Sequence, residues 1–274
     1  MVSIIAAILV ITGLGFLFGY ALALAAKKFA VSKDERAAAI EELLPGANCG
    51  ACGFPGCAGY AEAIVSSKAE ADLCAPGGAA SANGIARIMG VSVKSSDERV
   101  ARVFCGGGSD RTTQKYRYNG LADCFAVHAL FDGHLVCSDG CLGFGSCARV
   151  CRFDAIDIDA AGHAHINEDR CTGCGLCAKA CPRHLIELVN KKKRVHILCR
   201  SHLRGAVCNK MCEVSCIACM RCEKICKQNA IHISDNLAVI DYAACTSCGE
   251  CVAVCNKKCL MQFPSVQSVQ GGHR

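Results

Sequence analysis

The longest apolar stretch of the chain comes first. Residues 2–26 contain no charged side chain, and Lys27 and Lys28 follow directly. About 20 apolar residues span a bilayer as a helix, so residues 1–28 are expected to form a transmembrane anchor. A signal peptide is the alternative, because "ALALAA" resembles a cleavage site, but signal peptides begin with basic residues and have shorter apolar cores. The two lysines predict a single pass through the cell (inner) membrane, with the rest of the chain on the cytoplasmic side.

A short helix and then paired strands are predicted beyond the anchor. Residues 29–46 read as a helical spacer in which Ser32 and Glu35 match a capping box. Further on, β-branched residues alternate with polar ones, which is typical of strands. The segments "DAIDI" (154–158) and "AHI" (164–166) match "NAIHI" (229–233) and "AVI" (238–240). Each pair predicts a two-stranded hairpin, and the repetition predicts a duplicated module.

Cysteine dominates the candidate chemistry, with 26 of 274 residues. Disulfide frameworks belong to small secreted domains, whereas these cysteines lie in closely spaced groups within a long chain. Zinc sites use pairs of such groups at finger-length separations. The run "CTGCGLCAKACP" (171–182) is instead typical of iron–sulfur clusters, in which the fourth cysteine ligates the other cluster of a pair. Iron–sulfur ligation is therefore favoured, and a zinc scaffold remains the alternative.

The first cysteine region lies in a module expected over residues 47–78, and it reads "NCGACGFPGC" followed by "LCAPGG". Its glycines allow the backbone to pass close to a compact metal group. Its spacing differs from that of zinc fingers. We expect one self-contained 4Fe-4S cluster, bound by Cys49, Cys52, Cys57 and Cys74.

The last cysteine region contains two complete ferredoxin motifs in a module expected over residues 191–274. The fourth cysteine of each such motif ligates the partner cluster. This exchange predicts one cluster on Cys216, Cys219, Cys222 and Cys255, and a second on Cys226, Cys245, Cys248 and Cys251.

The middle region, after a linker over residues 79–98, is a divergent copy of the same module over residues 99–190. Its first motif lacks the usual middle cysteine, with "LGFGS" (142–146) where the other copy has "IACMR" (217–221). Cys137 is taken as the substitute ligand. The expected ligand sets are then Cys137, Cys141, Cys147 and Cys181 for one cluster, and Cys151, Cys171, Cys174 and Cys177 for its partner.

The remaining cysteines leave a further site open. Cys259 corresponds to Leu185 of the middle copy, so it is expected to be a buried packing residue. Cys105 and Cys199 each end a strand-like run ahead of a module. With Cys124 and either Cys208 or Cys212 they are candidates for a sixth cluster, and ordinary packing is the alternative. The preferred set is Cys105, Cys124, Cys199 and Cys212.

Taken in order, these features resemble the B subunits of the Rnf complex, in their longer, clostridial-type form. The resemblance covers nearly the whole chain: the anchor, "NCGACGFPGC" (48–57), "GCLGFGSC" (140–147) and the ferredoxin motifs. It implies an electron-transfer subunit that accepts electrons from soluble reduced ferredoxin and passes them to membrane-bound flavin and iron–sulfur subunits. In that family, NAD reduction is coupled to Na⁺ or H⁺ export. Only Cys181 is followed by proline, a departure that leaves the cluster potentials and the order of transfer open.

The expected fold class is α+β: a transmembrane helix, a small helical 4Fe-4S module and two bacterial-type two-cluster ferredoxin-like modules. Residues 75–97 and 190–212 read as hinge-like. The expected cofactors are five 4Fe-4S clusters, with a sixth as the alternative. The chain has no P-loop and no strand-anchored G-x-G-x-x-G, so neither flavin nor nucleotide is expected. No acid–base catalytic residue is expected either.

Partners follow from the same patterns. The formal charge of +6 counts every thiol as neutral, so it does not indicate nucleic acid. The basic run "KKKR" (191–194) is expected to be solvated, with a docking patch for an acidic ferredoxin as the alternative. Two other hypotheses share the cluster motifs: an iron–sulfur subunit of a membrane formate dehydrogenase or hydrogenase, and an iron–sulfur redox sensor.

Overall fold

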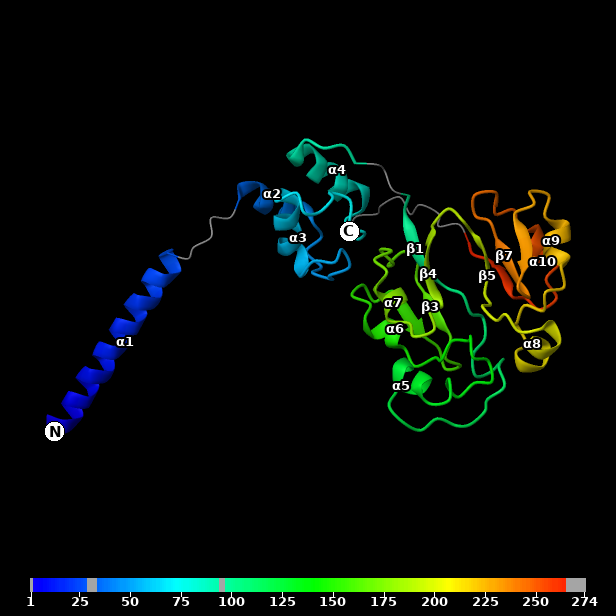
Figure 1. Cartoon of the computed structure of the whole chain (residues 1–274), viewed down its shortest axis with the longest axis horizontal. Coiled ribbons are helices and arrows are strands. Elements are labelled where there is room, and N and C mark those ends of the chain that lie inside the picture. The colour runs from blue at the N-terminus through cyan, green and yellow to red at the C-terminus, as the bar shows by residue number, and fades with distance from the viewer. Residues whose placement is uncertain (1, 29–33, 94–96, 265–274) are drawn as a thin grey trace, which may run out of the picture.

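The computed structural model describes residues 2–28, 34–93 and 97–264. Helix α1 (Val2–Lys28) stands apart from the rest of these residues (Figure 1). Its segment Leu9–Lys28 has a mean hydropathy of 2.1 and buries none of its surface in the protein. By length and composition it is therefore able to cross a membrane.

Three helices form a small unit of their own: α2 (Glu35–Leu43), α3 (Gly56–Val65) and α4 (Gly78–Met89). The carboxylate of Asp34 accepts a hydrogen bond from the Arg36 N–H and caps α2; the expected cap Ser32 lies outside the described residues. Ile40, Tyr60 and Ile85 are fully buried at the centre. The stretch 75–93, expected to be hinge-like, is therefore mostly the packed helix α4.

The middle module is built from two separate pairs of antiparallel strands. Strand β1 (Arg99–Val103) pairs with β4 (Ile186–Asn190), and β2 (Ile156–Ile158) pairs with β3 (Ala164–Ile166). Its helices are α5 (Cys124–Ala129), α6 (Ser146–Arg149) and α7 (Leu176–Lys179). The predicted hairpin over residues 154–166 is confirmed as β2–β3.

The last module has the same pattern of strand pairing. Strand β5 (Val195–Ile197) pairs with β8 (Leu260–Gln262), and β6 (Ile231–Ser234) pairs with β7 (Leu237–Ile240). Its helices are α8 (Gly205–Met211), α9 (Arg221–Ile225) and α10 (Glu250–Ala253). In each module, the two helices that contain the cysteine motifs (α6 and α7, or α9 and α10) lie between a β-hairpin and the pair formed by the first and last strands of the module. The described residues thus combine helices with small two-stranded sheets.

A buried ionic group joins the two modules. Glu168 follows β3 in the middle module, and its carboxylate accepts hydrogen bonds from Arg102 at 2.7 Å and from Arg194, just before β5, at 2.8 Å. The Arg102 guanidinium also lies 3.6 Å from the ring centre of Phe263, after β8. Within residues 190–212, expected to be hinge-like, Arg194 belongs to this ionic group and the strand β5 that follows it is buried.

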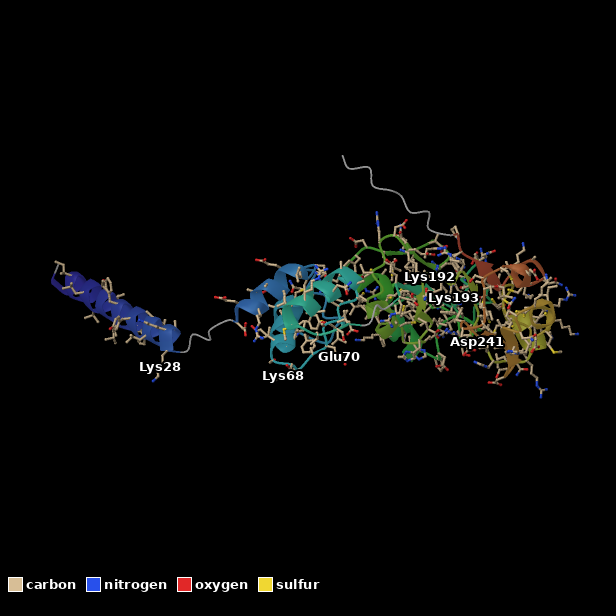
Figure 2. All side chains as sticks on the ribbon, turned by 90° about the horizontal axis from the view of Figure 1, so that it is seen from above. Lys28, Lys68, Glu70, Lys192, Lys193 and Asp241 are labelled. Carbon is tan, nitrogen blue, oxygen red and sulfur yellow. The ribbon has the colours of Figure 1, made fainter. Side chains whose placement is uncertain are left out.

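The basic run 191–194 is largely engaged within the protein rather than solvated. Lys193 donates a hydrogen bond to the Cys245 carbonyl at 2.7 Å, Lys191 lies 3.6 Å from Glu98, and Arg194 is buried against Glu168. Lys192 is exposed, 3.4 Å from Asp97, and Figure 2 shows Lys192 and Lys193 near the junction of the modules.

Candidate cysteine-lined metal sites

Four motif helices present a cysteine in the same way. Helices α6, α7, α9 and α10 each begin directly after a residue with left-handed backbone: Gly145 (φ 71°), Gly175 (φ 80°), Met220 (φ 59°) and Gly249 (φ 84°). This reversal turns the chain into a helix whose second residue is a buried cysteine: Cys147, Cys177, Cys222 and Cys251. The free N–H groups of the first helical turn favour negative charge there, as a thiolate would carry.

The cysteine after each of these helices also sits in a repeated turn. The residue three positions later has positive φ in every copy, namely Asp154, His184, Asn229 and Lys258. In three copies the next N–H donates to the cysteine sulfur: Ala155 to Cys151, Leu185 to Cys181 and Ala230 to Cys226, at 3.3–3.4 Å. Such N–H···S bonds stabilise thiolates and tune metal clusters.

The last module gathers its cysteines in two groups. One cavity is lined by the four predicted cysteines Cys216, Cys219, Cys222 and Cys255 and also by Cys259; the four predicted cysteines are here named the Cys222 site. Another is lined by Cys226, Cys245, Cys248 and Cys251, and is named the Cys251 site. These are the groupings that the motif spacing predicts. Cys219 and Cys248 are the exposed cysteines among the described residues.

The regular motif of the middle module forms a comparable group, named the Cys177 site: Cys151, Cys171, Cys174 and Cys177. Burial raises the pKa of Cys177 to about 12, and the neighbouring sulfurs of Cys171 and Cys174 add to this. The Ala101 N–H on β1 donates to the Cys171 sulfur at 3.4 Å. Cys151 lies in the same apolar core as Cys171 and Cys177.

The divergent motif differs from the expected grouping in one ligand position. Its cavity is lined by Cys124, Cys141, Cys147 and Cys181, and is named the Cys147 site. Cys137, the predicted substitute ligand, does not line it. Burial raises the pKa of Cys147 to about 11, and the sulfurs of Cys124 and Cys181 raise it further. The structure therefore places Cys124 where the sequence predicted Cys137.

The local fold explains why Cys124 arrives there. Asp123 caps α5 by accepting hydrogen bonds from the Phe125 and Ala126 N–H groups. The Ser146 hydroxyl at the start of α6 donates to Asp123 at 2.9 Å and accepts from the Cys124 N–H at 2.8 Å. Arg149 also pairs with Asp123. These bonds fasten α5 to α6, which carries Cys147.

Cys137 belongs to a different cavity at the junction of the two modules, here named the junction site. Its cysteines are Cys105, Cys137, Cys199 and Cys212, with Cys141 at the edge shared with the Cys147 site. The Thr112 hydroxyl lies 3.4 Å from the Cys212 sulfur, so it is placed to donate to that sulfur. The expected sixth group is thus present with Cys137 in place of Cys124.

Burial of the junction thiols indicates what they fit chemically. Burial raises the pKa of Cys137 to about 12 and that of Cys199 to about 11, with the Cys105 sulfur adding to both. Buried thiols with raised pKa values, such as Cys105, Cys137 and Cys199, are neutral in isolation and ionise only with a compensating cation. Arg183 supplies one positive charge nearby and donates a hydrogen bond to the Cys137 carbonyl at 3.1 Å. The donor set is that of a cysteine-ligated metal cluster.

The helical unit brings its four cysteines together as well, in the Cys57 site: Cys49, Cys52, Cys57 and Cys74. Burial raises the pKa of Cys74, and the sulfurs of the other three raise it further. The Asn48 amide oxygen accepts a hydrogen bond from the Cys57 N–H at 2.8 Å and holds the loop against α3. Beside it, Gly56 has φ +90°, and a Cβ there would meet Asn48 at 2.8 Å.

Two cysteines do not belong to these sets of four, although Cys259 lines the cavity of the Cys222 site. Cys208 on α8 is fully buried, and its sulfur lies 3.3 Å from the Leu203 carbonyl oxygen and 3.7 Å from the Ser201 hydroxyl. Cys259 is buried with its sulfur 3.6 Å from that of Cys255, so its predicted burial is confirmed.

Within the described residues, each cysteine site lies next to another cysteine site. Cys49 is close enough to Cys174 to add to the raised pKa that burial gives the latter, and Cys147 acts likewise on Cys177. The Cys141 N–H donates to the Cys105 sulfur at 3.2 Å, which joins the Cys147 site to the junction site. Cys216 neighbours Cys199. The Cys222 and Cys251 sites share one apolar core.

Known proteins resemble both the modules and the whole chain. The Fe-S cluster family model matches residues 44–76, and the 4Fe-4S dicluster domain model matches residues 135–188. The B subunit of the ion-translocating oxidoreductase complex of Methanosarcina acetivorans is 40% identical over 94% of this chain and 97% of its own length. The B subunit of the Na⁺-translocating ferredoxin:NAD⁺ oxidoreductase complex of Acetobacterium woodii is 40% identical over 90% of this chain and 74% of its own length.

A third relative agrees with these two. The B subunit of the proton-translocating ferredoxin:NAD⁺ oxidoreductase complex of Clostridium ljungdahlii is 39% identical over 94% of this chain and 91% of its own length. Identity at this level across almost the full length extends well beyond the shared cysteine motifs. The chain therefore belongs to the B-subunit family of the Rnf-type ion-translocating oxidoreductase complexes.

Proposed function

We propose that the chain is the iron–sulfur electron-transfer subunit of a membrane-bound, ion-translocating ferredoxin:NAD oxidoreductase. It accepts electrons from reduced ferredoxin and relays them to flavin and iron–sulfur partner subunits, with Na⁺ or H⁺ export coupled to NAD reduction. The named relatives support this role. They favour it over the formate dehydrogenase, hydrogenase and redox-sensor hypotheses.

The cofactors proposed are six 4Fe-4S clusters, each held by four cysteines. The ligand sets are those of the Cys57, Cys177, Cys147, junction, Cys222 and Cys251 sites. When bound, the clusters supply one-electron transfer. The chain's own contribution is to exclude water by burial, to donate N–H bonds to the sulfurs and to keep the six groups in sequence.

One observation carries the proposal: the junction site takes cysteines from both ferredoxin-like modules. Cys105 and Cys137 come from the middle module, and Cys199 and Cys212 from the last. Without a cofactor there, the two modules would present two separate pairs of sites. With a cluster at the junction site, neighbouring sites form a continuous row. The row runs from the exposed Cys219 and Cys248 to the Cys57 site in the helical unit.

The same row suggests an orientation in the complex. Soluble ferredoxin would meet the last module, where the exposed cysteines lie. The Cys57 site belongs to the unit that follows α1, which we propose as a single-pass anchor with the cysteine modules on the cytoplasmic side. Electrons would therefore leave toward the membrane-bound subunits.

A reduction experiment tests the relay. The chain is purified without oxygen and mixed with reduced two-cluster ferredoxin in a stopped-flow spectrometer, and bleaching of its cluster absorbance is followed. We expect bleaching that exceeds the loss attributable to one pair of clusters. A chain that stays oxidised while the ferredoxin remains reduced would contradict the proposed function.

Paired alanine substitutions test the ligand sets. If Cys105 and Cys137 share a site, Cys105→Ala with Cys137→Ala loses about four iron, as many as either change alone. Cys105→Ala with Cys124→Ala then loses about eight. The reverse pattern would restore the grouping expected from sequence. Cys208→Ala, at a packing cysteine, is the control and should lose none.

A further inference from the structure

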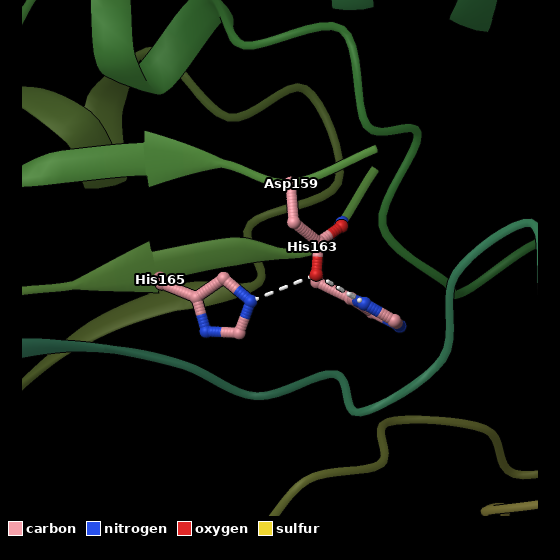
Figure 3. A group of neighbouring side chains, drawn as sticks. All are labelled: Asp159, His163 and His165. Carbon is pink, nitrogen blue, oxygen red and sulfur yellow. Dashed lines mark hydrogen bonds and ion pairs between the residues drawn. The ribbon is translucent and has the colours of Figure 1, made fainter. Parts of the chain in front are cut away.

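A group of three ligand-type side chains, none of them a cysteine, lies on the β2–β3 hairpin. Asp159 directly follows β2, and His163 and His165 stand two positions apart at β3, which puts them on one face of the strand. Figure 3 shows the Asp159 carboxylate between the two imidazole rings. Its Oδ2 lies 2.9 Å from His163 Nδ1 and 3.0 Å from His165 Nε2.

The backbone of the hairpin turn holds the carboxylate in place. The other oxygen of Asp159, Oδ1, accepts hydrogen bonds from the Ala161 N–H at 2.9 Å and the His163 N–H at 2.8 Å. Gly162, with φ +81°, supplies the left-handed turn between them. Oδ2 is thereby aimed at the imidazoles before any ligand arrives.

The far side of His163 has the environment of a metal-binding histidine. The side chain is only 10% exposed, and its Nε2 lies 3.3 Å from the Asp110 carboxylate without a hydrogen-bond partner. Metal-ligating histidines commonly have a carboxylate at the nitrogen that does not bind the metal, which fixes the ring and raises its basicity. In the tautomer with its proton on Nε2, His163 presents the Nδ1 lone pair to Asp159, and a cation between them would be bound by both groups.

We propose that Asp159, His163 and His165 form a binding site for one divalent transition-metal ion, with Zn²⁺ as the preferred cation. Two imidazole nitrogens and one carboxylate oxygen are ligands that zinc accepts, and a water would complete a tetrahedron. The three donor atoms lie within 4.8 Å of one another. Tetrahedral ligands at about 2.0–2.1 Å are about 3.3 Å apart, so the contacts to Oδ2 open by a few tenths of an ångström.

The hairpin turn contacts the loops that carry cysteines of two neighbouring sites. In the turn, the Ala161 carbonyl accepts a hydrogen bond from the Ser109 N–H at 2.8 Å. Gly162, also in the turn, packs on Gly143. These contacts reach the loop that carries Cys105 on one side and Cys141 on the other. A bound ion would fasten the turn between the junction and Cys147 sites, and slow iron loss from them.

The test uses the full holoprotein, purified without oxygen, and one to two equivalents of zinc chloride. Isothermal titration should show one Zn²⁺ per chain, and zinc K-edge absorption should show nitrogen and oxygen neighbours without sulfur. His165→Ala and Asp159→Asn should abolish this binding while the iron content stays unchanged. Asp110→Asn should weaken the affinity by about 10–100-fold.

The matched control is His232→Ala, an exposed histidine on β6 of the sister hairpin, and it should bind zinc as the parent does. Three results would overturn the proposal: no zinc taken up by the parent, zinc retained after His165→Ala, or sulfur neighbours in the absorption spectrum. The last would mean that zinc reached a free thiol. None of these outcomes depends on the cluster count, so the proposed function is tested separately.

Discussion

Replacing Glu168 by glutamine tests whether the two ferredoxin-like modules are fixed to one another. The side chains of Glu168, Arg102 and Arg194 are 12%, 4% and 12% exposed. Burial opposes ionisation of the carboxyl, but hydrogen bonds from Arg194 and Arg102 outweigh it and lower its pKa. Glu168→Gln removes the charge and leaves two buried guanidinium groups facing each other.

The expected loss is large for a single substitution. Breaking a buried ion pair by removing one partner costs about 3–5 kcal/mol. In a domain of this size each kcal/mol shifts the unfolding midpoint by about 2–4 °C, so a fall of about 6–20 °C is expected. Because the folded pKa is depressed, the contribution is complete above the unfolded value near pH 4.5 and is lost as pH falls through the folded value.

The assay is thermal unfolding of the anaerobic holoprotein at a fixed scan rate, since loss of clusters makes unfolding irreversible. Circular dichroism reports the backbone, and visible absorbance reports the clusters. Glu98→Gln, which disrupts the exposed Lys191 pair, is the matched control and should change stability by at most about 1 kcal/mol. If Glu168→Gln behaves like this control, the modules are not held by the buried ionic group.

Two further substitutions probe the junction. His196 is fully buried, donating through Nε2 to the Lys193 carbonyl and accepting from the Tyr242 hydroxyl, and burial, helped by Arg102, lowers its pKa to about 4. The unfolded chain therefore binds more protons between about pH 4 and 6.5, so the free energy of unfolding should fall by about 3 kcal/mol as the pH drops through that window. His196→Gln should flatten this profile in denaturant titrations, and an unchanged slope would contradict it. Arg183→Gln should lower the reduction potentials of the clusters at the Cys147 and junction sites, because a partly buried positive charge beside them is lost. Redox titrations followed by electron paramagnetic resonance measure these potentials. Arg183→Lys should restore most of the shift, and equal potentials in all three proteins would refute the electrostatic role.

Local sequence patterns were sufficient for much of the fold. The four short helices at the cysteine motifs were not among the expected elements, although each motif needs one sharp left-handed turn and one helical turn to converge on a compact group. Even Met220, where the other copies have glycine, adopts the same φ > 0. The hairpins were readable, since alternating residues on short strands have a period of two. Apolarity alone predicted the long N-terminal helix α1.

The exchange of Cys124 and Cys137 could not be read in the same way. Both lie between β1 and α6, Cys124 at the start of α5 and Cys137 in the loop after it, and no regular ferredoxin spacing relates them to the motif cysteines. Their positions depend on contacts distant in sequence: Asp123 with Ser146, and Arg183 with the Cys137 carbonyl. The packed junction was missed for a related reason. Glu168 and its two arginines are charged residues, whose burial becomes evident only when the partners are assembled.

The count of iron, acid-labile sulfide and zinc per chain tests the central claim most directly. It is made on the anaerobically purified holoprotein, with protein concentration from quantitative amino-acid analysis. Six clusters require about twenty-four iron and twenty-four sulfide per chain. About twenty of each in a fully folded protein would remove the junction cluster, and with it the unbroken row of sites. Zinc in place of iron throughout would contradict the electron-transfer function itself.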